Sequence, residues 1–481
     1  MTRALVTGAT GYVGSRLVRA LLDADHDVVA TARRPDSLVE FPWRDEVEVA
    51  PLDVLDDDSV TAALSNGHVD VAYYLVHAIG EGDFTELDRR GATTFGAAAA
   101  AAGVDRIVYL GGFVPTEERL SRHLASRAET EEVLEASGVP VVSLRAAVVI
   151  GAGSTSFEII RALAGRLSVL PVPTWMSHQV QPIAVDDVLH YLVAAASPDV
   201  PPGAYDIAGE DVLPYRDLLQ RFVDAAGVRR ALLPIPLPVV PPKLAGAVIG
   251  LITPVPGGLT TDLVDSLANT MVAGDDRIRA LVPDPPGGLT SLDDALRRAF
   301  EPAVDDDDPL HLASTDPAWA GGDAQSAVVD RPVRAPAANL WERIEGIGGA
   351  RWGFYGWPLP WRTAHVLGRL ATGHGPTVTR AGRGTWSVGD TVGLFRVASV
   401  VPGRSVRFVA GTAGPGRASL DLRVAPDGPD RCTLHIRAIW APAGGTGRVT
   451  GWALRPLHAG AFTGLARTLA RDAEGTLATV D

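Results

Sequence analysis

The first 146 residues alternate short apolar runs with longer amphipathic stretches. The apolar runs, rich in Val, Ala and Leu, span residues 3–7, 27–32, 47–51, 69–76, 106–111 and 141–146. Stretches with helical composition, such as Thr85 to Ala102, lie between them. This alternation is typical of a parallel sheet covered by helices, and mostly hydrophobic strands such as Val141 to Leu144 indicate burial of both faces. The sequence therefore predicts an α/β fold with a doubly wound, Rossmann-type sheet.

Beyond residue 146 the pattern changes to shorter units. Helical patterns cover residues 157–167, 185–196 and 215–226, and a last helix is predicted to start at Ser291 and end near Phe300. Ser291 and Asp294 have capping-box spacing, so their side chains can satisfy backbone donors where that helix begins. We therefore expect a substrate-side subdomain over about 151–300, which completes a first domain of residues 1–300.

The most apolar stretch, from Ala231 to Leu259, contains seven prolines and Lys243. A membrane-spanning helix needs ~20 consecutive apolar residues without such interruptions. The sequence therefore predicts no transmembrane segment, and we interpret this stretch as buried or as the lining of a cleft. A weak contact with a membrane surface is the alternative.

Residues 301–325 separate two regions that differ in their pattern of apolar and polar residues. This segment contains four successive aspartates, Asp305 to Asp308, several prolines and a Gly-Gly pair. Such a composition buries too little apolar area to offset its ordering entropy, so it predicts a linker. Residues 326–478 then form a separate α+β domain, with strands near 391–400, 405–410, 419–424 and 431–440 and helices near 337–347 and 452–470. The last of these strands alternates apolar Cys432 and Leu434 with polar Thr433 and His435, as a half-buried antiparallel strand does.

Charge and cysteine content narrow the classes of function. The net charge is −14 and the sequence pI about 5.3, which disfavours nucleic acid as a partner because phosphate binding relies on Lys and Arg. One cysteine, Cys432, excludes an intramolecular disulfide or a Cys-rich zinc site, and the histidines have no metal-ligand spacing. Without a signal-peptide pattern the chain is expected to be cytoplasmic. Its expected partner is a small molecule.

A glycine loop follows the first predicted strand directly. Gly8, Gly11 and Gly14 stand in a GxxGxxG pattern, and a helix is predicted from about Tyr12 to Ala24. Glycines at this place allow a tight turn and a close approach of the backbone to a pyrophosphate, while the helix N-terminus offers free N–H groups. A strand before the loop and a helix after it are the context that such a motif requires. The sequence therefore predicts a dinucleotide site.

The end of the second strand indicates which dinucleotide is bound. An NAD site usually places an acidic residue there, ~20 residues beyond the loop, to accept hydrogen bonds from the ribose. This chain has Ala32 followed by Arg33 and Arg34. Two guanidinium groups attract a 2′-phosphate, so NADP(H) is favoured over NAD(H). The alternative is that both arginines are solvated surface charges.

The loop TGATGYVG, Asp53 after the third strand and the run VVSLRAAVVIGAGSTSFEIIR from Val141 resemble the atypical short-chain dehydrogenase/reductase superfamily, in its NmrA-like branch. The resemblance covers about residues 1–300. YYLVHAIG from Tyr73 and QPIAVDDVL from Gln181 are similar to a bacterial subgroup that carries a C-terminal domain of unknown function. That domain, which includes WERIEGIGG from Trp341, is similar to helix-grip folds that enclose a hydrophobic cavity.

The resemblance implies a role for residues at matching positions. It implies that Gly8, Gly11 and Gly14 hold the pyrophosphate, Arg33 and Arg34 the 2′-phosphate, and Asp53 the adenine, with Val76 and Gly111 beside the nicotinamide. Thr10, Tyr12 and Val13 of the same loop are also expected to bind the cofactor. The superfamily's Tyr-xxx-Lys pair is replaced here by His123 and Arg127, and the chain contains a single lysine, Lys243. The usual pair therefore cannot be present.

Two functions follow from this departure. In the first, the protein is an NADP(H)-dependent oxidoreductase of an apolar carbonyl or quinone-like substrate, with His123 as proton donor and Arg127 polarising the substrate or holding the ribose. The alternative interpretation of the two residues is a surface or interhelix pair. In the second, the protein binds NADP(H) without turnover and acts as a sensor or ligand-binding regulator.

Two further sets of residues are candidates for ligand binding. The cleft is predicted to be lined by residues at the carboxyl ends of strands and on the segment that covers them, namely His77, Phe113, Arg145, Trp175, His178 and Gln181. The second domain holds seven of the ten tryptophans: Trp341, Trp352, Trp357, Trp361, Trp386, Trp440 and Trp452. They suit either an aromatic-lined cavity or ordinary core packing.

Overall fold

The computed structural model describes residues 2–38, 41–78, 83–115, 120–235, 246, 249, 257–267, 269–300, 316, 325–347, 378–379, 385–392, 395–410, 416–442 and 462–475. The chain forms two compact units, Met1–Gly322 and Asp323–Asp481. The division between them falls within the segment predicted as a linker. Each unit has its own hydrophobic core.

The first unit is built on a parallel sheet of seven strands in the order β11-β6-β5-β4-β1-β2-β3. These strands are β1 (Arg3–Val6), β2 (Asp27–Ala32), β3 (Glu48–Pro51), β4 (Val71–Tyr74), β5 (Arg106–Gly112), β6 (Val141–Ala146) and β11 (Gly203–Asp206). The six predicted strands are confirmed. The prediction lacks β11, because its sequence GAYD has no apolar run and only its pairing with β6 makes it a strand.

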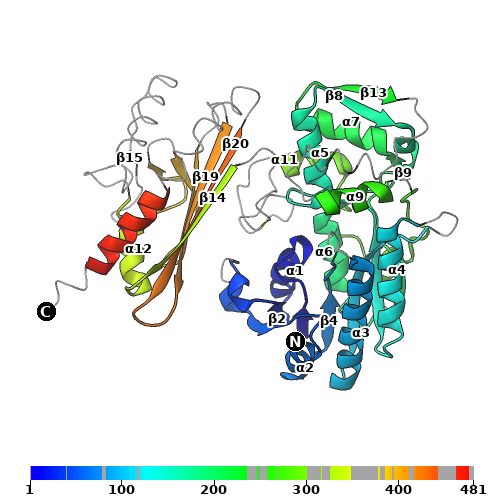
Figure 1. The fold of residues 1–481 in the computed structure, drawn as a ribbon, viewed down its shortest axis with the longest axis horizontal. Coiled ribbons are helices and arrows are strands. Elements are labelled where there is room, and N and C mark those ends of the chain that lie inside the picture. The colour runs from blue at the N-terminus through cyan, green and yellow to red at the C-terminus, as the bar shows by residue number, and fades with distance from the viewer. Residues whose placement is uncertain are drawn as a thin grey trace. The chain divides into compact units, whose positions relative to one another are not determined.

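Helices cover both faces of this sheet (Figure 1). One face carries α1 (Tyr12–Asp23) and α6 (Val185–Ala194), and the other carries α2 (Asp57–Ser65), α3 (Phe84–Ala102) and α4 (Arg122–Glu135). Leu17 of α1 and Val188 of α6 belong to one core cluster, whereas Phe95 of α3 belongs to the other. The short helices η1 (Pro35–Leu38) and η2 (Arg44–Glu46) precede β3. This is the doubly wound arrangement that the sequence predicts.

A second group of short elements forms the region that the sequence predicts as a substrate-side subdomain. Its helices are α5 (Thr155–Arg166), η3 (Thr174–Ser177), α7 (Tyr215–Ala225), α9 (Gly257–Ser266), α10 (Arg277–Leu281) and α11 (Leu292–Phe300). Its strands pair as β7 (Val149–Ile150) with β10 (Ile183–Ala184), β9 (Gln179–Val180) with β12 (Leu213–Pro214), and β8 (Val169–Pro173) with β13 (Ala231–Ile235). The predicted cap of α11 is confirmed, since the Asp294 N–H donates to the Ser291 Oγ over 3.2 Å.

Tilted and edge-on contacts between aromatic rings hold three of these helices together. Phe157 of α5, Phe222 of α7 and Phe300 of α11 have ring centroids between 4.8 and 5.2 Å apart. Offset and edge contacts of this kind add stability beyond the apolar area that they bury. They fix α5 and α7, which both contribute to the cavity described below.

Asp316 lies in the segment predicted as a linker, yet its side chain is buried. It is 4% exposed, and its carboxylate accepts hydrogen bonds from both terminal nitrogens of Arg16 in α1, each over 2.8 Å. A buried acidic residue is stable only with such a charged partner. Asp316 therefore fastens its part of the chain to the helix that begins at the glycine loop.

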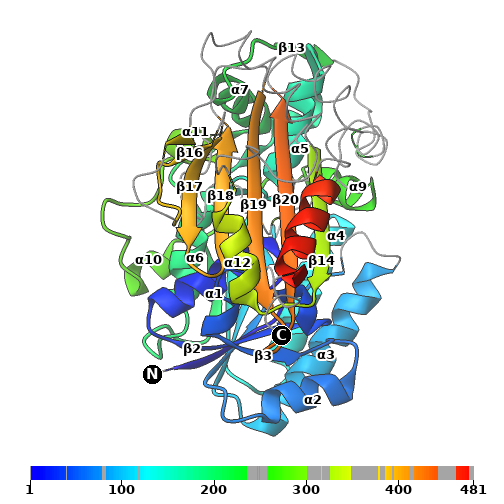
Figure 2. The same cartoon turned by 90° about the vertical axis from the view of Figure 1, so that its left-hand side faces the viewer.

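The second unit is an antiparallel sheet with helices on one face (Figure 2). Its strand order is β14 (Gln325–Val333), β20 (Cys432–Pro442), β19 (Gly416–Pro426), β18 (Ser405–Ala410), β17 (Phe395–Val401), β16 (Thr391–Val392) and β15 (Val378–Thr379). Helix α12 (Ala337–Glu345) and a helix over 462–475 pack on the same face. Cys432, Leu434 and Ile436 are buried, which confirms the predicted alternation of β20.

Two of the predicted tryptophans are part of this unit's core. Trp341 is 7% exposed and Trp386 3%, and the Trp386 Nε1 donates to the Ile344 carbonyl over 3.1 Å. The side chains of Trp352, Trp357, Trp361, Trp440 and Trp452 lie outside the described residues. For the two described side chains, core packing is therefore what the structure shows.

Candidate functional site

The glycine loop makes a tight turn between β1 and α1. Gly8 has a φ of 65°, in the left-handed region that favours glycine, and its carbonyl accepts the Gly11 N–H over 2.8 Å. A Cβ on Gly14 would lie 2.2 Å from the Gly8 oxygen, so only glycine lets α1 pack this closely on the loop. Gly11 is the N-cap residue and no side chain caps α1. The backbone N–H groups that open α1 therefore suit a diphosphate, whose charge the helix dipole also favours.

A cavity of about 720 Å³ begins at this loop. It runs past the ends of β4, β5 and β6, where Leu75, Gly111 and Ala146 line it, and continues between α5, α7 and α9. The walls beyond the sheet are mostly aliphatic and include Ile159, Ile160, Leu163, Leu167, Leu170, Leu218, Leu219, Leu263, Val264 and Met271. One continuous space thus joins the glycine loop to an apolar compartment.

A small polar cluster lines the cavity where the sheet ends. His77 follows β4, and His123 and Arg127 lie one turn apart on α4, with the Ser121 Oγ capping that helix through the Leu124 N–H over 3.2 Å. Burial, together with the positive charge of Arg127, lowers the pKa of His123 to about 3 and that of His77 well below its usual value. Both imidazoles are therefore neutral near pH 7.

Arg127 supplies positive charge to this cluster. Burial lowers the pKa of its guanidinium, which is in turn raised by Tyr109 and Asp88, yet an arginine stays charged at neutral pH. Asp88 is engaged elsewhere, since its carboxylate accepts from the Ala78 N–H over 2.7 Å and from the Ser126 hydroxyl over 3.0 Å. The cavity therefore presents a buried cation where the glycine loop and the apolar compartment meet.

The protonation state of His123 changes its predicted role. A proton donor must carry a transferable proton at the working pH, and an ordinary histidine titrates near 6.5. With a pKa of about 3, the His123 imidazolium has lost its proton at a pH well below 7. The imidazole can still donate one hydrogen bond as a neutral ring. The sequence could not indicate this, because the shift comes from burial and from a neighbouring charge.

The structure distributes the predicted cofactor residues over two places. Gly8, Gly11, Tyr12, Val13, Gly14 and Gly111 line the cavity. Thr10 is exposed at the tip of the loop, Arg33 and Arg34 are exposed at the end of β2, and Val76 is half-buried. Asp53 follows β3, and its Oδ1 accepts the Leu55 N–H over 3.0 Å. Arg33 and Arg34 have no carboxylate partner within the described part of the chain.

Of the six predicted substrate residues, two line the cavity and four lie outside its lining. His77 and Trp175 line the cavity. Of the described residues outside its lining, Phe113 is 3% exposed in the core and Arg145 forms an ion pair with Glu131. The Gln181 side chain donates to the Gly209 carbonyl over 2.8 Å, and the His178 Nδ1 is buried. Packing engages Phe113, an ion pair engages Arg145 and a hydrogen bond engages Gln181, whereas the buried His178 Nδ1 has no hydrogen-bond partner within the described part of the chain.

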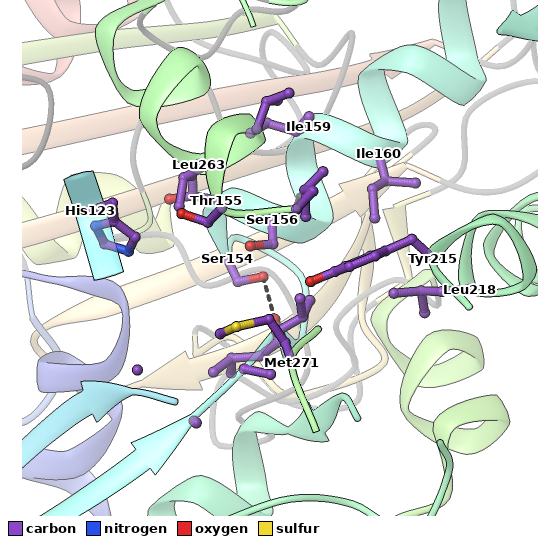
Figure 3. A pocket seen from close by; sticks show the side chains of 18 of the residues that line it. His123, Ser154, Thr155, Ser156, Ile159, Ile160, Tyr215, Leu218, Leu263 and Met271 are labelled. Carbon is purple, nitrogen blue, oxygen red and sulfur yellow. Dashed lines mark hydrogen bonds between the residues drawn. The ribbon is translucent and has the colours of Figure 1, made fainter. Parts of the chain in front are cut away.

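Several residues that line the cavity could not be predicted from the sequence. Ser154, Thr155 and Ser156 open α5, Tyr215 opens α7, and Leu263 lies in α9 (Figure 3). The serine-rich start of α5 resembles an ordinary helix cap in sequence, and the Ser154 Oγ does accept the Phe157 N–H over 3.3 Å. Ile249, from the apolar stretch expected to line a cleft, also lines the cavity, whereas Leu233 is 56% exposed.

Two families match the chain. Residues 8–166 match a family described as NAD(P)H-binding, and residues 323–465 match a protein family of unknown function, DUF2867. The first match begins at the glycine loop and ends in α5, and the second covers most of the antiparallel unit. No helix in the described part of the chain is long and apolar enough to cross a membrane.

Curated relatives match part of the chain. A ceramide reductase of Caulobacter vibrioides is 34% identical over 197 residues, which cover 39% of this chain and 59% of that protein. An uncharacterized protein of Mycobacterium tuberculosis is 29% identical over 240 residues, 50% of this chain and 24% of that protein. The matched part is thus less than two thirds of either relative.

Solved structures share the fold of the first unit. An NADPH-dependent quinone oxidoreductase from Escherichia coli, complexed with NADPH, has a TM-score of 0.50 and 20% identity over 63% of this chain and 100% of its own. A nucleoside-diphosphate-sugar epimerase from Staphylococcus aureus has a TM-score of 0.50 and 17% identity over 62% of this chain and 100% of its own. At these identities the likeness is one of fold.

Proposed function

We propose that this chain, which joins an NAD(P)H-binding domain of the atypical short-chain dehydrogenase/reductase type to a DUF2867 domain, is an NADPH-dependent reductase of apolar carbonyl compounds. One observation carries the proposal. The glycine loop, the pair His123 and Arg127, and an aliphatic compartment line the same cavity. Such a cavity brings a reductant, a polarising group and an apolar substrate together.

The residues of the chain divide the chemistry between them. A bound nicotinamide nucleotide supplies a hydride to the carbonyl carbon. The neutral His123 ring donates a hydrogen bond to the carbonyl oxygen, and the Arg127 charge stabilises the negative charge that develops there. Because His123 carries no spare proton near pH 7, the resulting alkoxide takes its proton from water, and the product is the alcohol.

The preference for NADPH rests on the end of β2. Ala32 occupies the place where an acidic residue would repel a 2′-phosphate, and the exposed guanidinium groups of Arg33 and Arg34 follow it. Neither group is neutralised by a carboxylate within the described residues. A phosphate at this position gains charge-assisted hydrogen bonds that a ribose hydroxyl cannot make.

The aliphatic walls favour a lipid-like substrate. Leu163, Leu167 and Leu218 leave little polar surface beyond the sheet, so a hydrocarbon group gains free energy in proportion to the area that it buries. The ceramide reductase relative is named for a lipid substrate, which supports this class. Long-chain ketones are therefore the first compounds to test, with apolar quinones beside them.

The test follows NADPH absorbance in the purified full chain with methyl nonyl ketone and with an apolar quinone. We expect turnover in the wild type and a loss of roughly 100-fold in Arg127→Met, because that change removes the charge facing the oxyanion. The control is Arg122→Met, which removes an exposed guanidinium on the same helix that pairs with Asp83. Equal rates in all three proteins would refute the role of Arg127.

A second candidate function is that of a non-catalytic NADPH sensor, favoured by the absence of a protonated donor at His123. Calorimetry separates the two. NADPH binding without oxidation across the ketone and quinone panel would support the sensor and overturn the reductase. Failure to bind either nicotinamide nucleotide would overturn both.

A further inference from the structure

The paired strands β8 and β13 present apolar side chains to solvent. They run parallel, with Val169 opposite Ala231 and Pro171 opposite Leu233. Because side chains alternate along a strand, these four residues share one face, which we call the outer apolar face. All four are exposed. Leu233, at 56%, and Val169, at 48%, are the two most exposed large apolar residues in the described part of the first unit.

The same pair of strands forms part of the cavity wall. Leu170, on the opposite face of β8, is 2% exposed and lines the cavity. Pro171 also lines the cavity although it is exposed, so the wall of the apolar compartment reaches the molecular surface at this strand. Both views place β13 at the end of the first unit beyond α7, away from the seven-stranded sheet (Figures 1 and 2). The outer apolar face is thus the outside of a wall whose inside lines the cavity.

Positive charge adjoins the outer apolar face. Arg229 and Arg230 directly precede β13, and Arg229 is exposed. The Arg230 guanidinium donates to the Ala164 carbonyl of α5 over 2.6 Å. The last acidic residues before the two strands are Glu158, which pairs with an arginine of its own helix, and Asp224, which accepts a hydrogen bond from a glutamine of its own helix. The chain has a net charge of −14, yet its charge beside this face is positive.

A membrane surface fits this combination better than a second copy of the chain does. In a two-fold dimer the outer apolar face of one copy would meet the same face of the other, so the arginines of both copies would lie close together and repel. The headgroups of anionic phospholipids attract such charges. At physiological ionic strength, charges farther than about 8 Å away are largely screened, so the local charge decides this contact and the net charge does not.

We propose that the outer apolar face, with Arg229 beside it, docks the protein on an anionic phospholipid bilayer, and that the apolar compartment receives its substrate from the bilayer at β8. The second part rests on the proposed reductase function, whereas the first part does not. Each basic residue near an anionic membrane contributes about 5-fold to the affinity. The exposed apolar side chains contribute in proportion to the area that they bury.

The test measures cosedimentation of the purified full chain with vesicles of phosphatidylcholine alone, and of equal parts of phosphatidylcholine and phosphatidylglycerol. We expect the wild type to bind the mixed vesicles about 5-fold more tightly or better. Val169→Ser with Leu233→Ser should weaken binding to both kinds of vesicle about 10-fold. Arg229→Gln should weaken binding to the mixed vesicles alone, by about 5-fold.

The matched control changes two exposed apolar side chains of the second unit. Val388 is 65% exposed and Val401 50%, so Val388→Ser with Val401→Ser removes a similar amount of exposed apolar surface. This double variant should bind both kinds of vesicle as the wild type does. Equal losses in the two double variants would mean that general surface hydrophobicity drives the binding, which would overturn the proposal.

Three other results would overturn the docking surface. One is a wild type that stays in the supernatant with both kinds of vesicle. Another is equal vesicle binding by the wild type and by Val169→Ser with Leu233→Ser. The third comes from sedimentation velocity: a wild-type dimer that the same double variant dissociates, without vesicle binding, would assign the outer apolar face to self-association.

A rate measurement with NADPH separates this proposal from the reductase. We expect Val169→Ser with Leu233→Ser to lower the rate with a long-chain ketone embedded in mixed vesicles about 10-fold. The rate with methyl nonyl ketone in solution should stay near that of the wild type, because neither residue belongs to the described lining of the cavity. Equal losses with both ketones would make the two residues structural and overturn the route from the bilayer. Vesicle binding without reduction of either ketone would refute the reductase and keep the docking surface.

Discussion

Replacing Gly14 by alanine tests whether the loop is held in the shape that binds a diphosphate. The added Cβ would lie 2.2 Å from the Gly8 oxygen, 2.8 Å from the Gly8 carbonyl carbon and 3.2 Å from the Ala9 Cα. All three contacts are with backbone, so no side chain can rotate away. Because ordinary contacts with carbon begin near 3.4 Å, the loop and α1 must separate by about 1 Å.

The size of the effect follows from what that separation breaks. Overpacking of this kind costs about 1–3 kcal/mol in the free energy of unfolding. The same shift moves the N–H groups of α1 away from the phosphates, and each charge-assisted hydrogen bond lost there costs about 1.5–3 kcal/mol. We therefore expect the Kd for NADPH to rise about 100-fold in Gly14→Ala, with a cooperative unfolding transition retained.

Two other glycines complete the series. A Cβ on Gly11 would lie 3.1 Å from the Gly8 oxygen, a contact that a small shift relieves, and one on Gly475 in the second unit meets nothing within 4 Å. Calorimetry with NADPH and urea unfolding should rank the losses in the order Gly14→Ala, Gly11→Ala, Gly475→Ala, with the last near zero. A folded Gly14→Ala protein with the wild-type Kd for NADPH would refute this account of the loop.

Three further predictions follow from charges. Replacing Arg33 and Arg34 together by serine should raise the Kd for NADPH at least 10-fold and leave that for NADH unchanged, and equal effects on both nucleotides in calorimetry would contradict the proposed phosphate contact. Asp316→Ala removes the carboxylate that pairs with the buried Arg16 guanidinium, so urea unfolding should show a decrease of about 3–5 kcal/mol in the free energy of unfolding. A decrease below about 1 kcal/mol would contradict a stabilising role for this buried pair. Burial and the neighbouring Asp186 raise the pKa of Asp187 from 3.8 to about 7. The folded state therefore binds a proton at Asp187 more tightly than the unfolded state does, so the free energy of unfolding of the wild type should fall as pH rises from about 4 to 7. Asp187→Asn should remove that part of the pH dependence, roughly 1–2 kcal/mol, and an unchanged slope in thermal unfolding would refute the assignment.

The local pattern of apolar and polar residues was enough to predict the regular elements of both units. The strand at Val141–Ala146 has the predicted bounds, as has that at Ser405–Ala410, because a buried parallel strand and a half-buried antiparallel strand leave different patterns in contiguous residues. The pairs β7 with β10 and β9 with β12 are two-residue strands, too short to produce a period. They exist because distant segments meet.

By itself the sequence determined the Rossmann sheet and the glycine loop, since a strand, a turn and a helix in immediate succession specify their own geometry. Only the tertiary structure decided which residues share a cavity, because α4, α5, α7 and α9 bring together side chains that are more than 100 positions apart. It also decided that His123 is neutral and that Val169 and Leu233 share an exposed face. Both properties depend on the exclusion of water, on neighbouring groups and on strand pairing, which no stretch of sequence records.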